Sequence, residues 1–525
     1  MSNNVGFARA RSRVGLSLVW CATWVALSGA TLAQPRVAFV TSATGNGDLA
    51  SWADAEGRFG LQAADHVCQV LAARAGLASS EDFVAWMSDS ADDAYCRVQG
   101  LQGKRANLCG QATLPAAAGP WVRTDGLPFA ASLPALLNEG HVFYPLVLDE
   151  TGQPRVSSVV LTATSGLGEL EGSACSDWTA ADDQFVSSGN SGAGTRHWQT
   201  GASGPCSSSV SRRLACLQSG TGGPLPSFAP LSERVAFVTT SRGTGDLGSW
   251  PAAGGAQGVP AGDAVCVSRA SAAGLASPGS FKAWLSTASP ARDRFVHDGP
   301  WQRLDRVRIA DSLDDLTDGV LTAALNVDDA GNYRANPIMW TGTDNLGGAT
   351  GDHCASWTSA AGAVQGTAGW PNYSQFWSRV SERNCDNNAG HLYCFADVAP
   401  AAHSCTPGPG VLCLGAGGRF RVTIRFETPA GEQGEGRTVD IGRRDSGLFY
   451  FFDPDNMEML VKLLDGCAIN GHFWVFFAAT TDVGFELTVD DVVAGTSRVY
   501  DNPVGLAAPP VLDTVAFATC NAPQG

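Results

Sequence analysis

Hydrophobic residues in the first three quarters of the chain recur with the spacing of short strands and one helix. Residues 37–41 form a short apolar run typical of a buried strand. Residues 62–75 place apolar side chains on one face at helical spacing, which predicts an amphipathic helix. Ser80 is expected to cap a second short helix that carries Phe83 and Trp86. Glycine-rich and aromatic segments follow, so irregular strands and long loops are expected and the pattern favours the α+β class.

A different pattern begins near Cys405. Residues 420–426 alternate apolar and polar side chains with a period of two, as in a strand with one buried face. Further strands are expected over 448–452, 473–477 and 485–489. This pattern predicts an all-β sandwich domain over residues 405–525.

The two patterned stretches before Cys405 are copies of one another. Cys68 and Cys266 match at an offset of 198, and Cys175 and Cys354 match at an offset of about 180. The matching pairs include Phe39/Phe237, Asp48/Asp246, Asp65/Asp263, Trp86/Trp284, Arg123/Arg303, Asp125/Asp305, Thr179/Thr358, Cys206/Cys385 and Cys216/Cys394. One fold is therefore expected twice, over 35–218 and 233–398, with residues 219–232 as a linker.

The first 33 residues have the pattern of a secretory signal peptide. Three arginines precede an apolar stretch over 14–27 that is too short to span a bilayer, and small residues follow at 30–33. We expect cleavage after Ala33, no transmembrane segment in the mature chain, and a secreted, surface-displayed or periplasmic bacterial protein.

The cysteine count agrees with export. The chain has 15 cysteines; Cys21 lies in the predicted signal, and 15 − 1 leaves an even 14. Cys96 and Cys109 lack counterparts in the second copy and are expected to pair with each other. The four cysteines shared by the copies allow three connectivities each. We favour a nested one: Cys68–Cys216 with Cys175–Cys206, and Cys266–Cys394 with Cys354–Cys385. In the last domain we expect Cys405–Cys413 and Cys467–Cys520.

Short motifs are spread along nearly the whole second copy: Phe237–Thr239, Gly262–Asp263, Ala273–Leu275, Lys282–Ser286, Leu316–Gly319, Trp340–Thr343, Cys354–Thr358 and His391–Phe395. As a set, these motifs resemble a family of bacterial exported domains that includes the leptospiral endostatin-like outer-membrane proteins. The first copy is more divergent, with Leu161–Thr164 in place of the Trp-Thr-Gly-Thr run. The resemblance covers about two thirds of the chain. It implies tandem endostatin-like or C-type lectin-like domains with nested disulfides, and ligand or matrix binding in some members.

Charge and motif content narrow the function classes. The formal net charge is −16; removing three signal arginines makes it −16 − 3 = −19, which repels nucleic acid and anionic lipid. Cys-x-x-Cys, His-Glu-x-x-His and Gly-x-Ser-x-Gly motifs are missing from the sequence, and the histidines do not recur between the copies. Lectin-type calcium motifs are missing too. We therefore expect no catalytic residues, no metal and no cofactor, hence not an enzyme.

The polar residues shared by the copies allow two interpretations. They either line a ligand groove or anchor loops, because small loop-rich domains must satisfy backbone groups with capping and paired side chains. Aromatic residues in loops are the better candidates for ligand contact. The candidate ligand-binding residues are Trp301, Arg303, Trp370, Tyr373, Phe376 and Trp377. A self-packed aromatic loop over 370–377 is the alternative.

These observations predict an exported adhesion or binding protein that recognises an extracellular protein or matrix ligand through loops of two disulfide-bonded repeats. A calcium-independent lectin that binds glycans through the 370–377 loop is the first alternative. An extracellular hydrolase with an unrecognised site is the second. Two related heads would add avidity wherever both engage one ligand.

Overall fold

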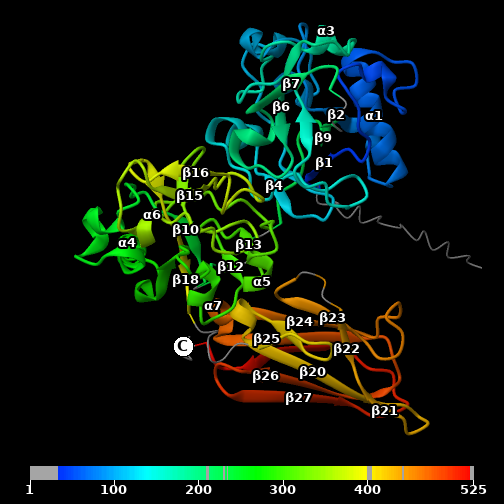
Figure 1. The fold of residues 1–525 in the computed structure, drawn as a ribbon. Helices are drawn as coiled ribbons and strands as arrows, with labels where there is room; N and C mark the ends of the chain where they lie inside the picture. The colour runs from blue at the N-terminus through cyan, green and yellow to red at the C-terminus, as the bar shows by residue number, and fades with distance from the viewer. Residues whose placement is uncertain are drawn as a thin grey trace, which may run out of the picture.

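A computed structural model describes residues 34–208, 212–226, 228, 231–232, 234–398, 405–439, 441 and 443–520 (Figure 1). The predicted signal peptide over 1–33 lies outside these residues. We refer to residues 35–218 as the first module, 233–398 as the second module and 405–525 as the last domain.

The first module is built around helix α1 and two small sheets. One sheet has the order β2-β9-β1-β3-β4 and the other β7-β6-β5-β8. The strands are β1 (Arg36–Val40), β2 (Phe83–Ala85), β3 (Trp121–Val122), β4 (Pro128–Ala130), β5 (Val159–Leu161), β6 (Phe185–Asn190), β7 (Ala202–Pro205), β8 (Arg212–Arg213) and β9 (Ala215–Gln218). The helices are α1 (Gly60–Arg74), α2 (Ala94–Val98) and α3 (Cys175–Trp178).

The second module repeats these pairings. Cys394 pairs with Phe237 and Ala283, as Cys216 pairs with Phe39 and Ala85 in the first module. Its strands are β10 (Ala236–Val238), β11 (Phe281–Ala283), β12 (Trp301–Gln302), β13 (Arg308–Ala310), β14 (Ile338–Trp340), β15 (Gln365–Gly369), β16 (Ser381–Asn384), β17 (Gly390–His391) and β18 (Tyr393–Ala396). Its helices are α4 (Gly258–Ala272), α5 (Leu313–Leu316) and α6 (Cys354–Trp357).

The last domain consists of two five-stranded sheets on either side of one apolar core. One sheet contains β19 (Leu412–Leu414), β20 (Phe420–Glu427), β21 (Gln433–Glu435), β26 (Gly484–Asp491) and β27 (Thr496–Asn502). The other has the order β22 (Arg437–Val439), β23 (Ser446–Tyr450), β24 (Met459–Gly466), β25 (His472–Ala479) and β28 (Val511–Phe517). Helix α7 (Cys467–Asn470) joins β24 to β25.

The expected α+β class is wrong. The chain is 31% strand and 19% helix, with several small sheets, which fits a mainly β fold. Only α1 and α4, at 15 residues each, are long helices among the described residues. The helix expected after Ser80 is also wrong: residues 80–82 form one 3-10 turn, and β2 follows. Phe83 and Ala85 are both buried on β9, so the two-residue spacing belongs to a strand.

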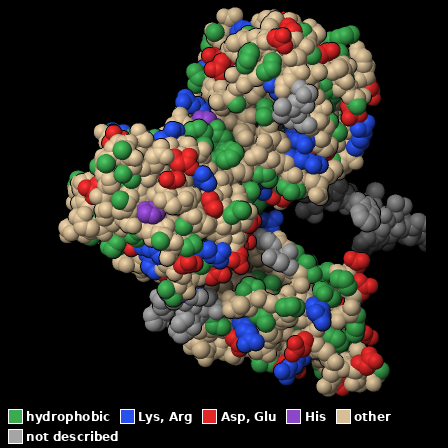
Figure 2. Space-filling model, in the orientation of Figure 1, with side chains coloured by type: hydrophobic (Ala, Val, Ile, Leu, Met, Phe, Trp, Pro, Cys, Tyr) green, Lys and Arg blue, Asp and Glu red, His purple; other side chains and the backbone are tan. Residues whose placement is uncertain are grey.

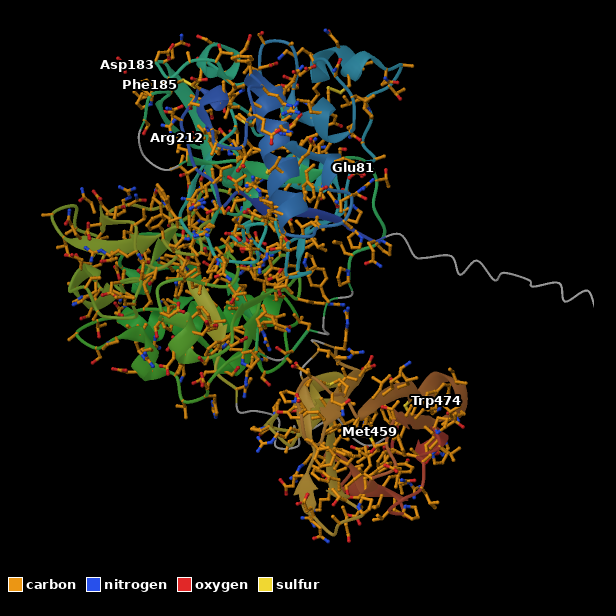
Figure 3. The ribbon with its side chains drawn as sticks, turned by 90° about the vertical axis from the view of Figure 1, so that its right-hand side faces the viewer. Glu81, Asp183, Phe185, Arg212, Met459 and Trp474 are labelled. Atoms are coloured by element: carbon orange, nitrogen blue, oxygen red, sulfur yellow. A yellow bond between two sulfur atoms is a disulfide. The ribbon has the colours of Figure 1, made fainter. Side chains whose placement is uncertain are left out.

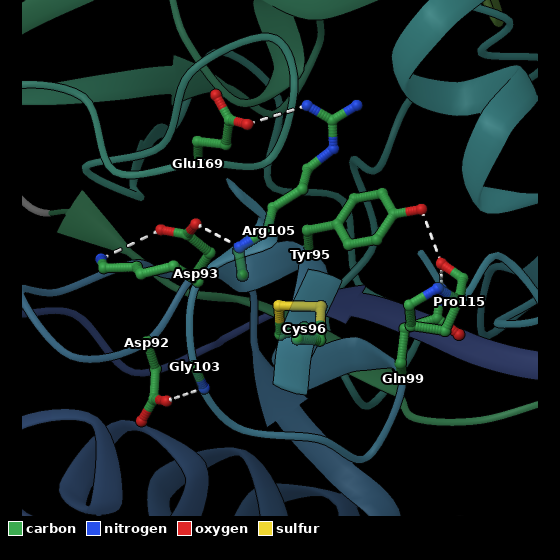
Figure 4. Close-up of a disulfide and its surroundings, with 12 residues drawn as sticks. Asp92, Asp93, Tyr95, Cys96, Gln99, Gly103, Arg105, Pro115 and Glu169 are labelled. Carbon is green, nitrogen blue, oxygen red and sulfur yellow. Dashed lines mark hydrogen bonds and ion pairs between the residues drawn. A yellow bond between two sulfur atoms is a disulfide. The ribbon is translucent and has the colours of Figure 1, made fainter. Parts of the chain in front are cut away.

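All seven predicted disulfides are present, so the expected pairing is confirmed. Cys68–Cys216 joins α1 to β9, and Cys266–Cys394 joins α4 to β18. Cys96–Cys109 closes the insertion of the first module (Figure 4). Beside it, Tyr95 donates to the Pro115 carbonyl at 2.6 Å. Seven disulfides fit an extracellular protein.

The length of the loop that each disulfide closes predicts how much it stabilises the first module. Replacing Cys68 and Cys216 with alanine removes a link across 148 residues, whereas the Cys96/Cys109 double variant removes one across 13. Because a longer link restricts the unfolded chain more, we expect losses of about 4–5 and about 3 kcal/mol. Urea denaturation of both double variants measures the difference. A larger loss for the Cys96/Cys109 variant would contradict this order.

Candidate functional site

Residues shared by the two modules mostly anchor loops. Asp263 accepts from the Ala283 amide at 2.9 Å and pairs with Arg294 at 2.5 Å. In the first module Asp65 makes the same bond to Ala85 and pairs with an arginine of the insertion. Each aspartate thereby ties the long helix to the strand that follows it. In this structure these aspartates anchor loops and do not line a ligand groove.

Arg303 is fully buried and belongs to the same class of anchors. Its guanidinium donates to Asp305 at 3.0 and 2.6 Å and to the Ala324 carbonyl at 2.8 Å. Burial acts to raise the pKa of Asp305, but the ion pair with Arg303 outweighs it, and the pKa lies below its ordinary value. The expectation that Arg303 contacts a ligand is therefore wrong in this structure.

Two of the candidate tryptophans are buried as well. Trp301 is 1% exposed, and its indole donates to the Ala396 carbonyl at 2.9 Å. Trp377 is also 1% exposed and packs against Trp284 and Tyr393. The expected surface positions of Trp301 and Trp377 are wrong, because the core between β18 and its neighbouring loops is filled by large aromatic rings.

The two modules contact each other through equivalent loops. Residues 192–194 follow β6, and residues 372–374 follow β15 at an offset of 372 − 192 = 180. The Gly194 amide donates to the Asn372 carbonyl at 2.6 Å, and the Ser374 amide donates to the Gly192 carbonyl at 3.0 Å. Because the two bonds are reciprocal, the modules meet as the two halves of a symmetric pair would.

Side chains extend this junction. Tyr144 of the first module is 6% exposed, lies in the apolar cluster of the second module, and accepts from the Arg308 amide at 3.1 Å. His141 stacks on Tyr333 with ring centroids 4.3 Å apart. The apolar core of the second module therefore continues into the first module.

The junction leaves a set of aromatic side chains at its edge, which we call the aromatic rim: Trp370, Tyr373, Phe376 and His197. Trp370 and Phe376 are each 36% exposed. Tyr373 lies between them, 5.8 Å from either ring, and 5.6 Å from His197 of the first module. Figure 2 shows hydrophobic side chains gathered where the first two modules meet. The rim thus combines residues from both modules on one surface.

The backbone holds the rim in place. The Trp370 amide donates to the Phe376 carbonyl at 2.8 Å and closes the loop. Within the loop, Asn372 and Ser374 are 1% and 0% exposed, because the first module covers them. A side chain at Gly369 would come within 1.8 Å of the Trp377 carbonyl, so only glycine permits this approach. The loop is therefore closed by its own backbone and packed against the first module, and its two outer rings remain partly exposed.

His197 and the loop over 192–194 escaped the sequence analysis. The histidine at position 197 is not repeated in the second module, where Phe376 takes the equivalent place, and a Gly-Ala-Gly sequence carries no chemical group that would mark it. The available signal was the complementarity of equivalent loops: the first module has small residues where the second has Asn372, Tyr373 and Ser374. Small residues opposite large ones allow two backbones to approach closely.

The described residues contain neither a side-chain cluster suited to a metal ion nor a helix suited to crossing a membrane. Within these residues no cluster of three or more His, Cys, Asp or Glu is placed to hold a metal ion. Asp453 accepts from the Asp455 amide at 2.9 Å and closes a turn. Of the helices in the described parts of the chain, none has the length and apolar content needed to cross a membrane.

Comparison with known proteins finds no family model that matches the chain and no curated protein that matches it. The resemblance to the leptospiral endostatin-like proteins therefore stays a prediction.

The pKa of His197 predicts how the rim responds to acid. Burial, together with the neighbouring Arg196, lowers this pKa from 6.5 to about 4. The unfolded chain takes up the proton near pH 6.5, whereas the folded chain does so only near pH 4. The free energy of unfolding therefore decreases as the pH falls from about 6.5 to about 4, because only the unfolded chain binds the proton in this range. We expect a loss of about 1–2 kcal/mol, less than the full shift because the ring is partly exposed.

Thermal unfolding between pH 7 and pH 4 measures this loss in the parent and in His197→Gln, which should show a flatter pH dependence. His472→Gln in the last domain is the matched control and should follow the parent. An unchanged slope in His197→Gln would contradict the assignment.

Proposed function

We propose that the chain is a non-enzymatic, extracellular binding protein that recognises a protein or matrix ligand through the aromatic rim. The observation that carries the proposal is the exposure of Trp370 and Phe376 at 36% each on a loop whose centre is buried between two modules. Exposed aromatic rings on rigid loops supply large contact areas at a small entropic cost.

The scaffold suits this role. Each module contains two disulfides at equivalent positions, and seven disulfides in all fit an extracellular location. Export through residues 1–33 is part of the proposal. With a formal net charge of −16, the chain favours neutral or cationic ligands over polyanions. Because the rim contains residues of both modules, the proposal assigns one composite site to the pair.

Binding to immobilised fibronectin, laminin and collagen tests the proposal. We expect saturable binding to at least one of them, and a loss of about tenfold or more in affinity for Trp370→Ala and for Phe376→Ala. The melting temperature should stay close to that of the parent, because both rings are partly exposed.

Phe185→Ala is the matched control: this aromatic ring is 63% exposed in the first module and lies outside the rim. Its affinity should equal that of the parent. Absence of saturable binding to all three proteins, or equal affinity in the rim variants and the control, would contradict the proposal. Saturable binding to an immobilised glycan array, with none to the three proteins, would replace the protein ligand by a sugar.

A further inference from the structure

The two sheets of the last domain present different surfaces to the solvent. In the sheet with β20 and β26, outward positions carry polar side chains; Arg421, Thr423 and Arg425 lie opposite Asp490, Thr488 and Glu486. In the sheet with β24 and β25, the inward side chains Met459, Val461 and Val475 are buried. The outward residues of that sheet are mostly apolar too. The outer surface of the sheet with β24 and β25 is therefore mostly apolar, whereas that of the sheet with β20 and β26 is polar.

Strand register arranges these outward apolar residues in rows. We call them the apolar face: Leu448, Leu460, Leu464, Trp474, Phe476 and Leu512. Leu448 lies opposite Leu460, Leu464 opposite Trp474, and Phe476 opposite Leu512. Leu460 and Leu512 are 38% and 70% exposed. Directly opposed residues share a face of the sheet, so these side chains lie on one outer surface, with Lys462 between Leu460 and Leu464.

The two aromatic rings of the apolar face, those of Trp474 and Phe476, are nearly parallel. A Cβ built on Gly466 would come within 2.2 Å of the indole nitrogen of Trp474, so the indole lies over this glycine. The indole donates to the Asn470 side chain at 2.9 Å, which fixes its direction. The Phe476 ring is inclined to the indole by only 21°, with centroids 5.9 Å apart. Figure 3 places Trp474 at the outer surface of the domain.

We propose that the apolar face binds a neutral polysaccharide chain. Pyranose rings have flat faces of C–H groups that pack on aromatic rings, and their hydroxyls bind polar groups at the edges. Lys462, Ser446 and His472 are outward polar residues in these rows and can contact such hydroxyls.

Charge favours an uncharged polymer over an anionic one. The charged side chains in these rows are only Lys462 and Arg437, whereas the whole chain carries −16. Two separated cations offer a polyanion little pairing, and the net charge opposes its approach, whereas an uncharged polymer meets no such repulsion. The binding therefore rests on apolar contact and is insensitive to salt. This site is separate from the aromatic rim and independent of the function proposed for it.

Retention of the full-length protein on microcrystalline cellulose and on chitin tests the proposal. We expect retention on at least one solid, with no release in about 0.5 M NaCl. Trp474→Ala and Phe476→Ala should each weaken it by about tenfold. Leu512→Ser, at a 70% exposed position, tests the same face without disturbing the core. Val499→Ala is the matched control, because Val499 is 54% exposed on the opposite sheet.

Retention on the polysaccharide should persist in Trp370→Ala. A wrong proposal for the aromatic rim can therefore be told apart from a wrong proposal for the apolar face. No retention on either solid would overturn the proposal, and so would equal retention of the control and all three face variants. Release by salt would indicate charge pairing and overturn it as well. A dimer in light scattering that Leu512→Ser dissociates, without retention on either solid, would assign the face to a second copy of the chain.

Discussion

The reciprocal pair of backbone hydrogen bonds between residues 192–194 and residues 372–374 determines which aromatic side chains of the 370–377 loop stay exposed. It brings equivalent loops of two related modules together and buries the centre of the longer loop. Trp370 and Phe376 lie on either side of that centre and keep part of their surface exposed. The contact is possible because one loop has glycines where the other has larger residues, so that two backbones approach within hydrogen-bonding distance.

The modules hold their loops without extensive regular structure. Long segments between short strands have backbone groups that need partners, and buried charged residues provide them. Arg303 and Arg123 each bind an aspartate two residues along the chain and a carbonyl from another loop. Disulfides then connect the long helix to the equivalent strands β9 and β18 in the two copies. The repeated polar residues are therefore explained by the fold, and the proposed function assigns ligand contact to exposed aromatic rings instead.

Much of this arrangement could be predicted because it depends on matches within one sequence. The duplication, the unmatched pair Cys96/Cys109 and the alternation over 420–426 led to modules, disulfides and strands that the structure contains. The class was wrong because the loop-rich segments form many short strands, so that strand exceeds helix along the chain. The helix expected after Ser80 was wrong because the spacing of Phe83 and Trp86 suits a helix as well as a strand followed by a bend. The burial of Trp301 and Trp377 depends on tertiary contacts with Phe395 and Tyr393, which neighbouring residues do not reveal. The pairing of the modules was missed because glycines carry no chemical signal.

The central claim is that the two modules form one docked unit with the rim at its edge. A protease site inserted between residues 225 and 231 allows the covalent connection to be cut while the rest of the chain stays intact. After cleavage, size-exclusion chromatography under native conditions should show both modules in one peak, which denaturant then separates. Two separate peaks in native buffer would contradict the docked unit, and the composite rim with it.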